Sequence, residues 1–152
     1  MSAEQRILEL GIDLPAGAAP VGNYACAVQS GNLVFTSARA PLPVDGKLAK
    51  GRLGQEFSTD QGYALARSAC IDLMAVLKHQ LGSLDRIARF VELQGSINAA
   101  APFEDHAKVL DGASDLLVAV FGPAGVHARS VIGVSSLRNG VPLTIKATVE
   151  IL

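Results

Sequence analysis

The chain has 152 residues, the length of one domain, and 49% of them are hydrophobic while 18% are charged. Its 13 lysine and arginine residues are scattered along the sequence and matched by 14 acidic residues, so we expect no nucleic acid as a partner. No apolar run is long enough to cross a bilayer, and the first ten residues carry charges where a signal peptide would be apolar. These properties predict a soluble cytoplasmic protein with no membrane partner.

Motifs that hold metals and cofactors do not appear in the sequence. Cys26 and Cys70 each lie in an apolar run, where a cysteine is typically a small buried side chain. No two of the three histidines have the spacing of metal ligands. Gly122 and Gly125 precede a predicted strand, whereas phosphate and dinucleotide loops precede a helix. We therefore expect no metal and no cofactor.

The N-terminal quarter predicts a short helix followed by a β-hairpin. Ser2 and Gln5 have the spacing of a capping box, which predicts a helix over residues 3–10. After a loop rich in proline and alanine, the pattern predicts strands over 24–29 and 33–38, joined by a glycine-containing turn.

Both alternating sets of side chains in this hairpin are apolar, in 24–28 and again in 33–35. A sheet with one face in water would alternate more regularly between apolar and polar residues. We therefore expect both faces of the sheet to be covered, one by helices and the open face by a partner subunit.

A long loop and a long helix follow. The loop, residues 41–55, is rich in proline and glycine. Ser58 and Gln61 form a second capping box, and the helix that they start should run to Leu81, with Gly82 as its stop. One stripe of this helix is apolar and is predicted to be core: Ala66, Cys70, Leu73, Met74, Leu77 and Leu81.

The second half of the chain predicts a strand, another long helix and a closing pair of strands. The strand covers 85–98, and Pro102 opens the helix, which Gly122 ends. Residues 128–134 and 143–152 are predicted to pair with each other. The last of these strands alternates apolar and polar residues most regularly.

The resulting element order is β-β-α-β-α-β-β. It predicts one α+β domain over residues 1–152, with residues 1–19 as an N-terminal extension. Two long helices are enough to cover one face of such a sheet, but not both.

Arg129 is the main candidate for a functional residue, because of its position in the sequence. It starts an apolar strand, where a guanidinium costs free energy unless an anion pairs with it. The anion is either an acidic side chain of the protein or the carboxylate of a ligand, which the planar fork of an arginine matches. The sequence leaves both alternatives open. Of the histidines, only His127 is close enough to Arg129 in the chain to be considered for the same site.

Three stretches of the sequence carry a family resemblance. They are Val21-Gly-Asn-Tyr24, Gly31-Asn-Leu-Val-Phe-Thr-Ser37 and Ala128-Arg-Ser-Val-Ile-Gly-Val134. Together with the element order, they resemble the YjgF-like proteins, also called the Rid (reactive intermediate imine/enamine deaminase) family and formerly L-PSP endoribonucleases. The resemblance implies a chorismate mutase-like fold and a homotrimer. Its three sheets would form an inner barrel, with clefts between the subunits.

The resemblance also implies a site and a reaction. The residue that matches Arg129 holds the carboxylate of a 2-imino or 2-keto acid, and Tyr24 and Ser37 match residues that line the same cleft. The reaction is the hydrolysis of a reactive imine, or its enamine, to the keto acid and ammonia.

The sequence departs from the family pattern at three positions of this cleft. The glutamate that orients or activates the water matches Thr144, whose hydroxyl can position a water but is far too weak a base to deprotonate it. The ligand-contacting asparagine matches Gly112, and a cysteine matches Val131. We expect the loop 41–55 and the loop that carries His127 to reshape the cleft.

Two functions are therefore compatible with the sequence. One is an enzyme that hydrolyses 2-imino or enamine acids, and the other is a non-catalytic metabolite-binding or regulatory protein of the same fold. Both predict a small carboxylate as the partner. RNA cleavage is disfavoured because the charges are balanced, aromatic residues are few, and no pair of histidines is apparent.

Overall fold

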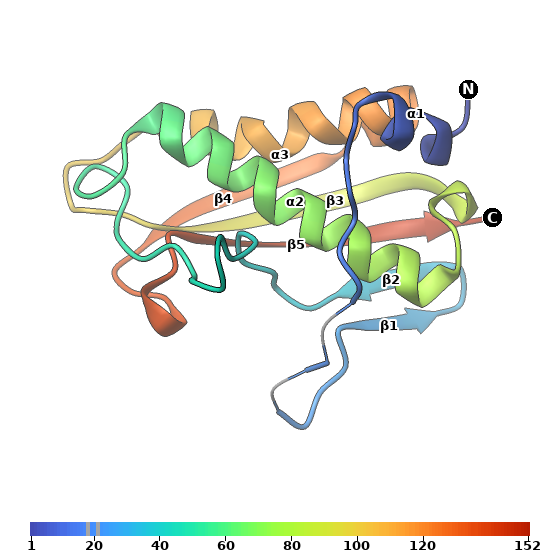
Figure 1. Ribbon diagram of the computed structural model, residues 1–152, viewed down its shortest axis with the longest axis horizontal. Helices are drawn as coiled ribbons and strands as arrows, with labels where there is room; N and C mark the ends of the chain where they lie inside the picture. The colour runs from blue at the N-terminus through green and yellow to red at the C-terminus, as the bar shows by residue number, and fades with distance from the viewer. Residues whose placement is uncertain (18, 21) are drawn as a thin grey trace.

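The structure is a computed structural model that describes residues 1–17, 19–20 and 22–152. It has a five-stranded sheet in the order β1-β2-β5-β3-β4, and α2 and α3 lie side by side across one face (Figure 1). The α+β fold is confirmed, as is the order β-β-α-β-α-β-β after a first short helix. The elements are α1 (Ala3–Glu9), β1 (Ala27–Ser30), β2 (Leu33–Thr36), α2 (Thr59–Leu81), β3 (Ile87–Asn98), α3 (His106–Phe121), β4 (Ala128–Val134) and β5 (Leu143–Ile151).

The capping signals placed the first two helices correctly. The Ser2 hydroxyl accepts the backbone N–H of Gln5 while the Gln5 side chain accepts the N–H of Ser2, which is a complete capping box. The same reciprocal pair starts α2 at Ser58, and α2 ends at Gly82, whose φ of 83° is the left-handed conformation that favours glycine. The apolar stripe of α2 is buried in the core, as predicted.

The predicted pairing of the last two strands is wrong. β5 lies between β2 and β3 and runs antiparallel to both, whereas β4 pairs with β3 and runs parallel to it. The reason is that α3 connects β3 to β4 as a crossover, which brings β4 back parallel beside β3. β4 is therefore an edge strand, and β5 occupies the middle of the sheet.

Two other predicted boundaries are also corrected. α3 begins at His106 and not at Pro102, because the N–H of Phe103 donates to the carbonyl of Ala100 in a turn that precedes the helix. The hairpin strands are shorter than predicted, since Tyr24 precedes β1 and β2 ends at Thr36. These differences move the helix and strand ends by two to four residues, and element boundaries are the least reliable part of a sequence-based prediction.

The two faces of the sheet differ in character. The side chains on the face toward α2 and α3 form the apolar core together with these helices. On the open face, the side chains of β3 and β5 are mostly polar. Apolar side chains are exposed near both edges of the open face, with Val28 at 55%, Phe35 at 45% and Ile132 at 59%. The exposed apolar surface predicted on the hairpin is thus present, and the subunit expected to cover it stays a prediction. Within the described part of the chain, no helix combines the length and apolarity that a membrane crossing requires.

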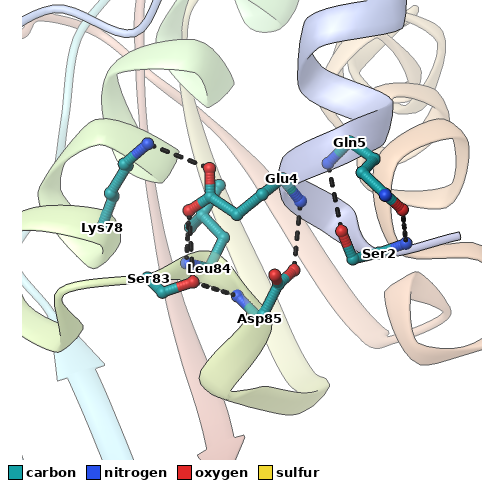
Figure 2. Close-up of polar contacts among 7 residues, drawn as sticks. All are labelled: Ser2, Glu4, Gln5, Lys78, Ser83, Leu84 and Asp85. Atoms are coloured by element: carbon teal, nitrogen blue, oxygen red, sulfur yellow. Dashed lines mark hydrogen bonds and ion pairs between the residues drawn. The ribbon is translucent and has the colours of Figure 1, made fainter.

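The helix α1 is fastened to the end of α2 by one carboxylate, that of Glu4 (Figure 2). It accepts hydrogen bonds from the Lys78 ammonium at 2.9 Å and from the Leu84 N–H at 2.9 Å, and the Glu4 N–H donates to Asp85 at 3.1 Å. Burial raises the pKa of Glu4, but the hydrogen bonds and the charge of Lys78 lower it by more, so its pKa lies below the ordinary 4.5.

We expect Glu4→Gln to lower the free energy of unfolding by roughly 1 kcal/mol at pH 7, because the amide keeps the shape of the side chain but loses the charge. Since folding depresses the pKa of Glu4, its contribution is complete above pH 4.5 and is lost as the pH falls through the lower value of the folded protein. Urea unfolding at pH 7 and at pH 3 measures both effects. The difference between variant and wild type should shrink at pH 3, and Glu9→Gln, at an exposed position of the same helix, should change neither value.

Candidate functional site

Arg129 lies on the edge strand β4 and points toward α3. It is in register with Leu93 of β3, whose side chain is buried in the core, so both side chains leave the sheet on the helix-covered face. Its Nη1 donates to Asp111 at 2.8 Å and to the Ser114 hydroxyl at 3.1 Å, and its Nη2 donates to the carbonyl of Ala107 at 3.3 Å. The guanidinium is thus held against one turn of α3.

This arrangement orients the guanidinium of Arg129 without using all of its donors. Three of its five N–H groups make the hydrogen bonds to α3. Among the described residues, the Nε–H and one N–H of Nη2 have no partner. The Arg129 side chain is 24% exposed and the Asp111 side chain 47%, so solvent reaches the pair. An oriented guanidinium with two available donors is suited to bind a carboxylate.

His127 belongs to the same polar group. Its Nε2 lies 2.9 Å from the Ser114 hydroxyl, and its Nδ1 lies 2.6 Å from the carbonyl oxygen of Gly125. Ser114 therefore contacts both Arg129 and His127. We call Asp111, Ser114, His127 and Arg129 the β4–α3 polar cluster.

Two other residues predicted for the site are close to this cluster in the sequence, but their positions contact the core or α2 instead. Val131 is on the same face of β4 as Arg129 and packs against the core, beside Gly95. Gly112 faces α2: a Cβ built on it would lie closer than 3.0 Å to the backbone carbonyl of Tyr63, a separation that real Cβ atoms essentially never show. The side chain that α3 presents to Arg129 comes from the preceding residue, Asp111.

The remaining predicted residues lie away from Arg129, at the β1–β2 end of the sheet or on its open face. Tyr24 is exposed before β1 and lines a pocket of about 460 Å³ between the N-terminal loop and α2. The Ser37 hydroxyl follows β2 and donates to the Ala25 carbonyl at 2.7 Å. Thr144 of β5 is in register with Ser96 and alternates with buried residues, which places its side chain on the open face. Within one chain, none of these three side chains meets Arg129.

Asp111 and Ser114 were missed by the sequence analysis. They are three residues apart and therefore neighbours on one side of α3, beside the apolar stripe. That spacing is the one signal that could have identified them, but it does not say that β4 lies opposite.

A second ion pair, between Arg39 and Asp72, joins the segment after β2 to α2. Its atoms are 2.5 Å apart and both side chains are largely buried. The hydrogen bond to Asp72 raises the pKa of Arg39. Because Arg39 also forms a backbone bridge with Ile145, the pair fastens the middle of the sheet to α2.

No group of histidine, cysteine and acidic side chains in residues 1–17, 19–20 and 22–152 has an arrangement that could hold a metal ion. Cys70 is fully enclosed by the core, and burial raises the pKa of its thiol to about 12. This cysteine is a packing residue that stays protonated at neutral pH.

Residues 4–144 match the family described as "YjgF/chorismate_mutase-like, putative endoribonuclease". Protein TCP17 of Trypanosoma cruzi is 38% identical over 143 residues, which are 93% of this chain and 89% of that protein. A Shewanella oneidensis structure with an endoribonuclease description superposes with a TM-score of 0.95 at 34% identity, over 99% of this chain and all of the other. RidA from an Antarctic Psychrobacter superposes with a TM-score of 0.60 at 26% identity, over 90% of this chain and 94% of the other. The resemblance seen in the sequence is confirmed: the chain belongs to the YjgF-like family.

Proposed function

We propose that the protein is a cytoplasmic homotrimer that binds small 2-imino and 2-keto acids at Arg129 and hydrolyses the imines to keto acids and ammonia. The observation that carries this proposal is the guanidinium of Arg129, which α3 orients while two of its donors stay available. A bidentate, charge-assisted contact is the strongest that the described residues around Arg129 offer to a carboxylate. The chain belongs to the YjgF-like family, and the resemblance to that family implies the same ligand class.

The positions of the other residues support a cleft that two chains build together. Arg129 lies at the β4 edge on the helix-covered face, whereas Tyr24 and Ser37 lie at the β1–β2 end of the sheet. Thr144 lies on the open face. Arg129 can share one cleft with Tyr24, Ser37 and Thr144 only if the β4 edge of one chain meets the β1–β2 end of the next. This is a head-to-tail contact, and in the proposed trimer it closes into a ring.

In this cleft Arg129 anchors the carboxylate, and Thr144 of the adjoining chain holds a water near the imine carbon. Fixing both reactants in place lowers the entropic cost of the addition. The threonine hydroxyl is too weakly basic to accept a proton from this water, so another group must take it.

A second candidate function is binding without catalysis, in which the trimer senses or buffers a keto acid. The observation in its favour is the threonine at position 144, where the resemblance implies a glutamate. RNA cleavage is not part of the proposal, because the basic residues of the chain form no surplus over the acidic ones.

The enzymatic proposal is tested with 2-imino acids generated in place by an amino acid oxidase. The wild-type protein should release ammonia faster than the spontaneous reaction in the same buffer, and Arg138→Ala, at an exposed arginine of the β4–β5 connection, should be equally fast. Arg129→Ala should be no faster than buffer. If the wild type binds keto acids but never exceeds the spontaneous rate across several side chains, the binding function replaces the enzymatic one.

A further inference from the structure

Asp111 places a negative charge directly beside the guanidinium of Arg129. Its Oδ1 accepts a hydrogen bond from Arg129 Nη1 at 2.8 Å, and no hydrogen bond from the described residues reaches its Oδ2. A ligand carboxylate bound to Nε and Nη2 of Arg129 would lie across the same guanidinium. Two hydrogen bonds and the width of the guanidinium then separate the two carboxylates by roughly 6 Å.

The charge of Asp111 also acts on groups beyond its partner Arg129. On α2, the hydroxyl of Tyr63 donates to Asp115 at 2.6 Å, and this hydrogen bond is the main reason why the pKa of Tyr63 is raised. The negative charge of Asp111 raises the same pKa further. Its field therefore reaches groups that it does not touch, as a field in a partly exposed site does.

The charges around the proposed ligand position balance one another. With histidine neutral, the charged side chains of the β4–α3 polar cluster are Arg129 and Asp111, which form an ion pair with no net charge. Tyr24, Ser37 and Thr144, which the adjoining chain would contribute, have uncharged side chains. The attraction of the pair for a second, more distant negative charge is therefore small.

Two further cations are paired with acidic side chains of their own. Lys108, one turn before Asp111 on α3, lies 3.9 Å from Asp105. Arg39, in the segment after β2, lies 2.5 Å from Asp72. A second carboxylate on a ligand thus finds no unpaired cation among these described residues, and it loses water when it enters the cleft.

We infer that Asp111 is a specificity-determining residue, which makes the Arg129 site selective for ligands with a single carboxylate. Without Asp111, Arg129 would attract both carboxylates of a dicarboxylic keto acid. With Asp111, the second carboxylate gives up water and gains no attraction in return. The substrate class is then 2-imino and 2-keto acids whose side chains carry no negative charge. This inference rests on the proposed function, because it assumes a ligand carboxylate on Arg129, but it requires no catalytic step.

Asp111 also orients Arg129, and that role alone makes a different prediction. Asparagine keeps the shape of the side chain and one acceptor oxygen for Nη1, but it removes the charge. If Asp111 only positions the guanidinium, Asp111→Asn should leave binding unchanged or weaken it by the same factor for every ligand. If its charge sets the specificity, the variant should bind keto acids more tightly, and dicarboxylic ones most of all.

The test uses two keto acids of similar size and shape. 5-Methyl-2-oxohexanoate carries an isopropyl group where 2-oxoglutarate carries its second carboxylate. In isothermal titration, the wild type should bind the monocarboxylate more tightly. Two unit charges about 6 Å apart in water repel enough to change a dissociation constant about threefold. We therefore expect Asp111→Asn to bind 5-methyl-2-oxohexanoate about threefold and 2-oxoglutarate about tenfold more tightly than the wild type does.

Three controls isolate the charge at position 111. Glu104→Gln removes the same charge from an exposed position before α3 and should bind both ligands as the wild type does. In about 1 M salt the Debye length is about 3 Å, so the difference between Asp111→Asn and the wild type should nearly vanish. Asp111→Ser removes the charge with another side chain and should shift the ratio of the two dissociation constants in the same direction.

The outcomes that would overturn the inference differ from those that would overturn the proposed function. If Asp111→Asn leaves the ratio of the two dissociation constants unchanged, or weakens both, Asp111 is only a positioning residue. If the wild type binds 2-oxoglutarate at least as tightly as 5-methyl-2-oxohexanoate, the site is not selective for one carboxylate. In both cases the carboxylate site at Arg129 stands. If the wild type binds neither of these ligands nor 2-ketobutyrate, the proposed function fails as well.

Discussion

Replacing Arg129 with alanine is expected to weaken the binding of 2-ketobutyrate on the order of 100-fold, because two charge-assisted hydrogen bonds to the carboxylate are lost together. Isothermal titration of the wild type and the variant with 2-ketobutyrate measures this change directly. The expected loss is large because the described residues of the β4–α3 polar cluster offer the ligand no other cation.

Two control variants separate the geometry of Arg129 from its charge. Arg129→Lys keeps the charge but cannot present a planar fork, so it should recover only a small part of the affinity. Arg138→Ala removes a cation from an exposed position and should bind as the wild type does. If Arg129→Ala binds 2-ketobutyrate with unchanged affinity, Arg129 serves only to clamp β4 to α3 through Asp111.

Replacing Gly112 with alanine should destabilise the protein by roughly 3 kcal/mol, because the added methyl meets the Tyr63 carbonyl of α2 inside van der Waals distance. The neighbouring atom is backbone, so the two helices must move apart for the side chain to fit. Urea unfolding monitored by circular dichroism at a fixed protein concentration measures the loss.

The control for this substitution is Val118→Ala, at an exposed position of the same helix. It should change the free energy of unfolding by less than about 0.5 kcal/mol. If Gly112→Ala unfolds at the same urea concentration as wild type, the close approach of α2 and α3 at this point is not present in solution.

Local signals predicted much of the fold. The two capping boxes and Gly82 predicted the start of α1 and both ends of α2. A cap pairs the free backbone groups at a helix end with residues only a few positions away in the chain, so its signal can be read from the local sequence. The alternation in residues 143–151 identified β5 for a similar reason, since one face of that strand is buried.

The order of the strands could not be predicted in the same way. β4 and β5 are consecutive in the chain, and consecutive strands usually lie side by side, yet β3 separates them. The regular alternation of β5 says that one of its faces is buried but not which strands flank it. Its central position depends on contacts with β2 and β3, which are distant in sequence.

The same limit applies to the site. Arg129 was identified because a guanidinium at the start of an apolar strand needs a partner, and the sequence left open whether that partner is an acidic side chain or a ligand. The structure places Asp111 against it, and the two donors that remain allow a ligand as well. Asp111 and Ser114 could not be assigned before the packing of α3 on β4 was known, because nothing in their own segment identifies what faces them.

A crystal structure with bound 2-ketobutyrate would show whether a small carboxylate binds to Arg129 between two chains. We expect the carboxylate oxygens at about 2.9 Å from Nε and Nη2 of Arg129, with Tyr24 and Thr144 of the adjoining chain facing the ligand. A keto acid bound at another place, or an Arg129 still bonded to Asp111, Ser114 and Ala107 alone in the saturated crystal, would contradict it.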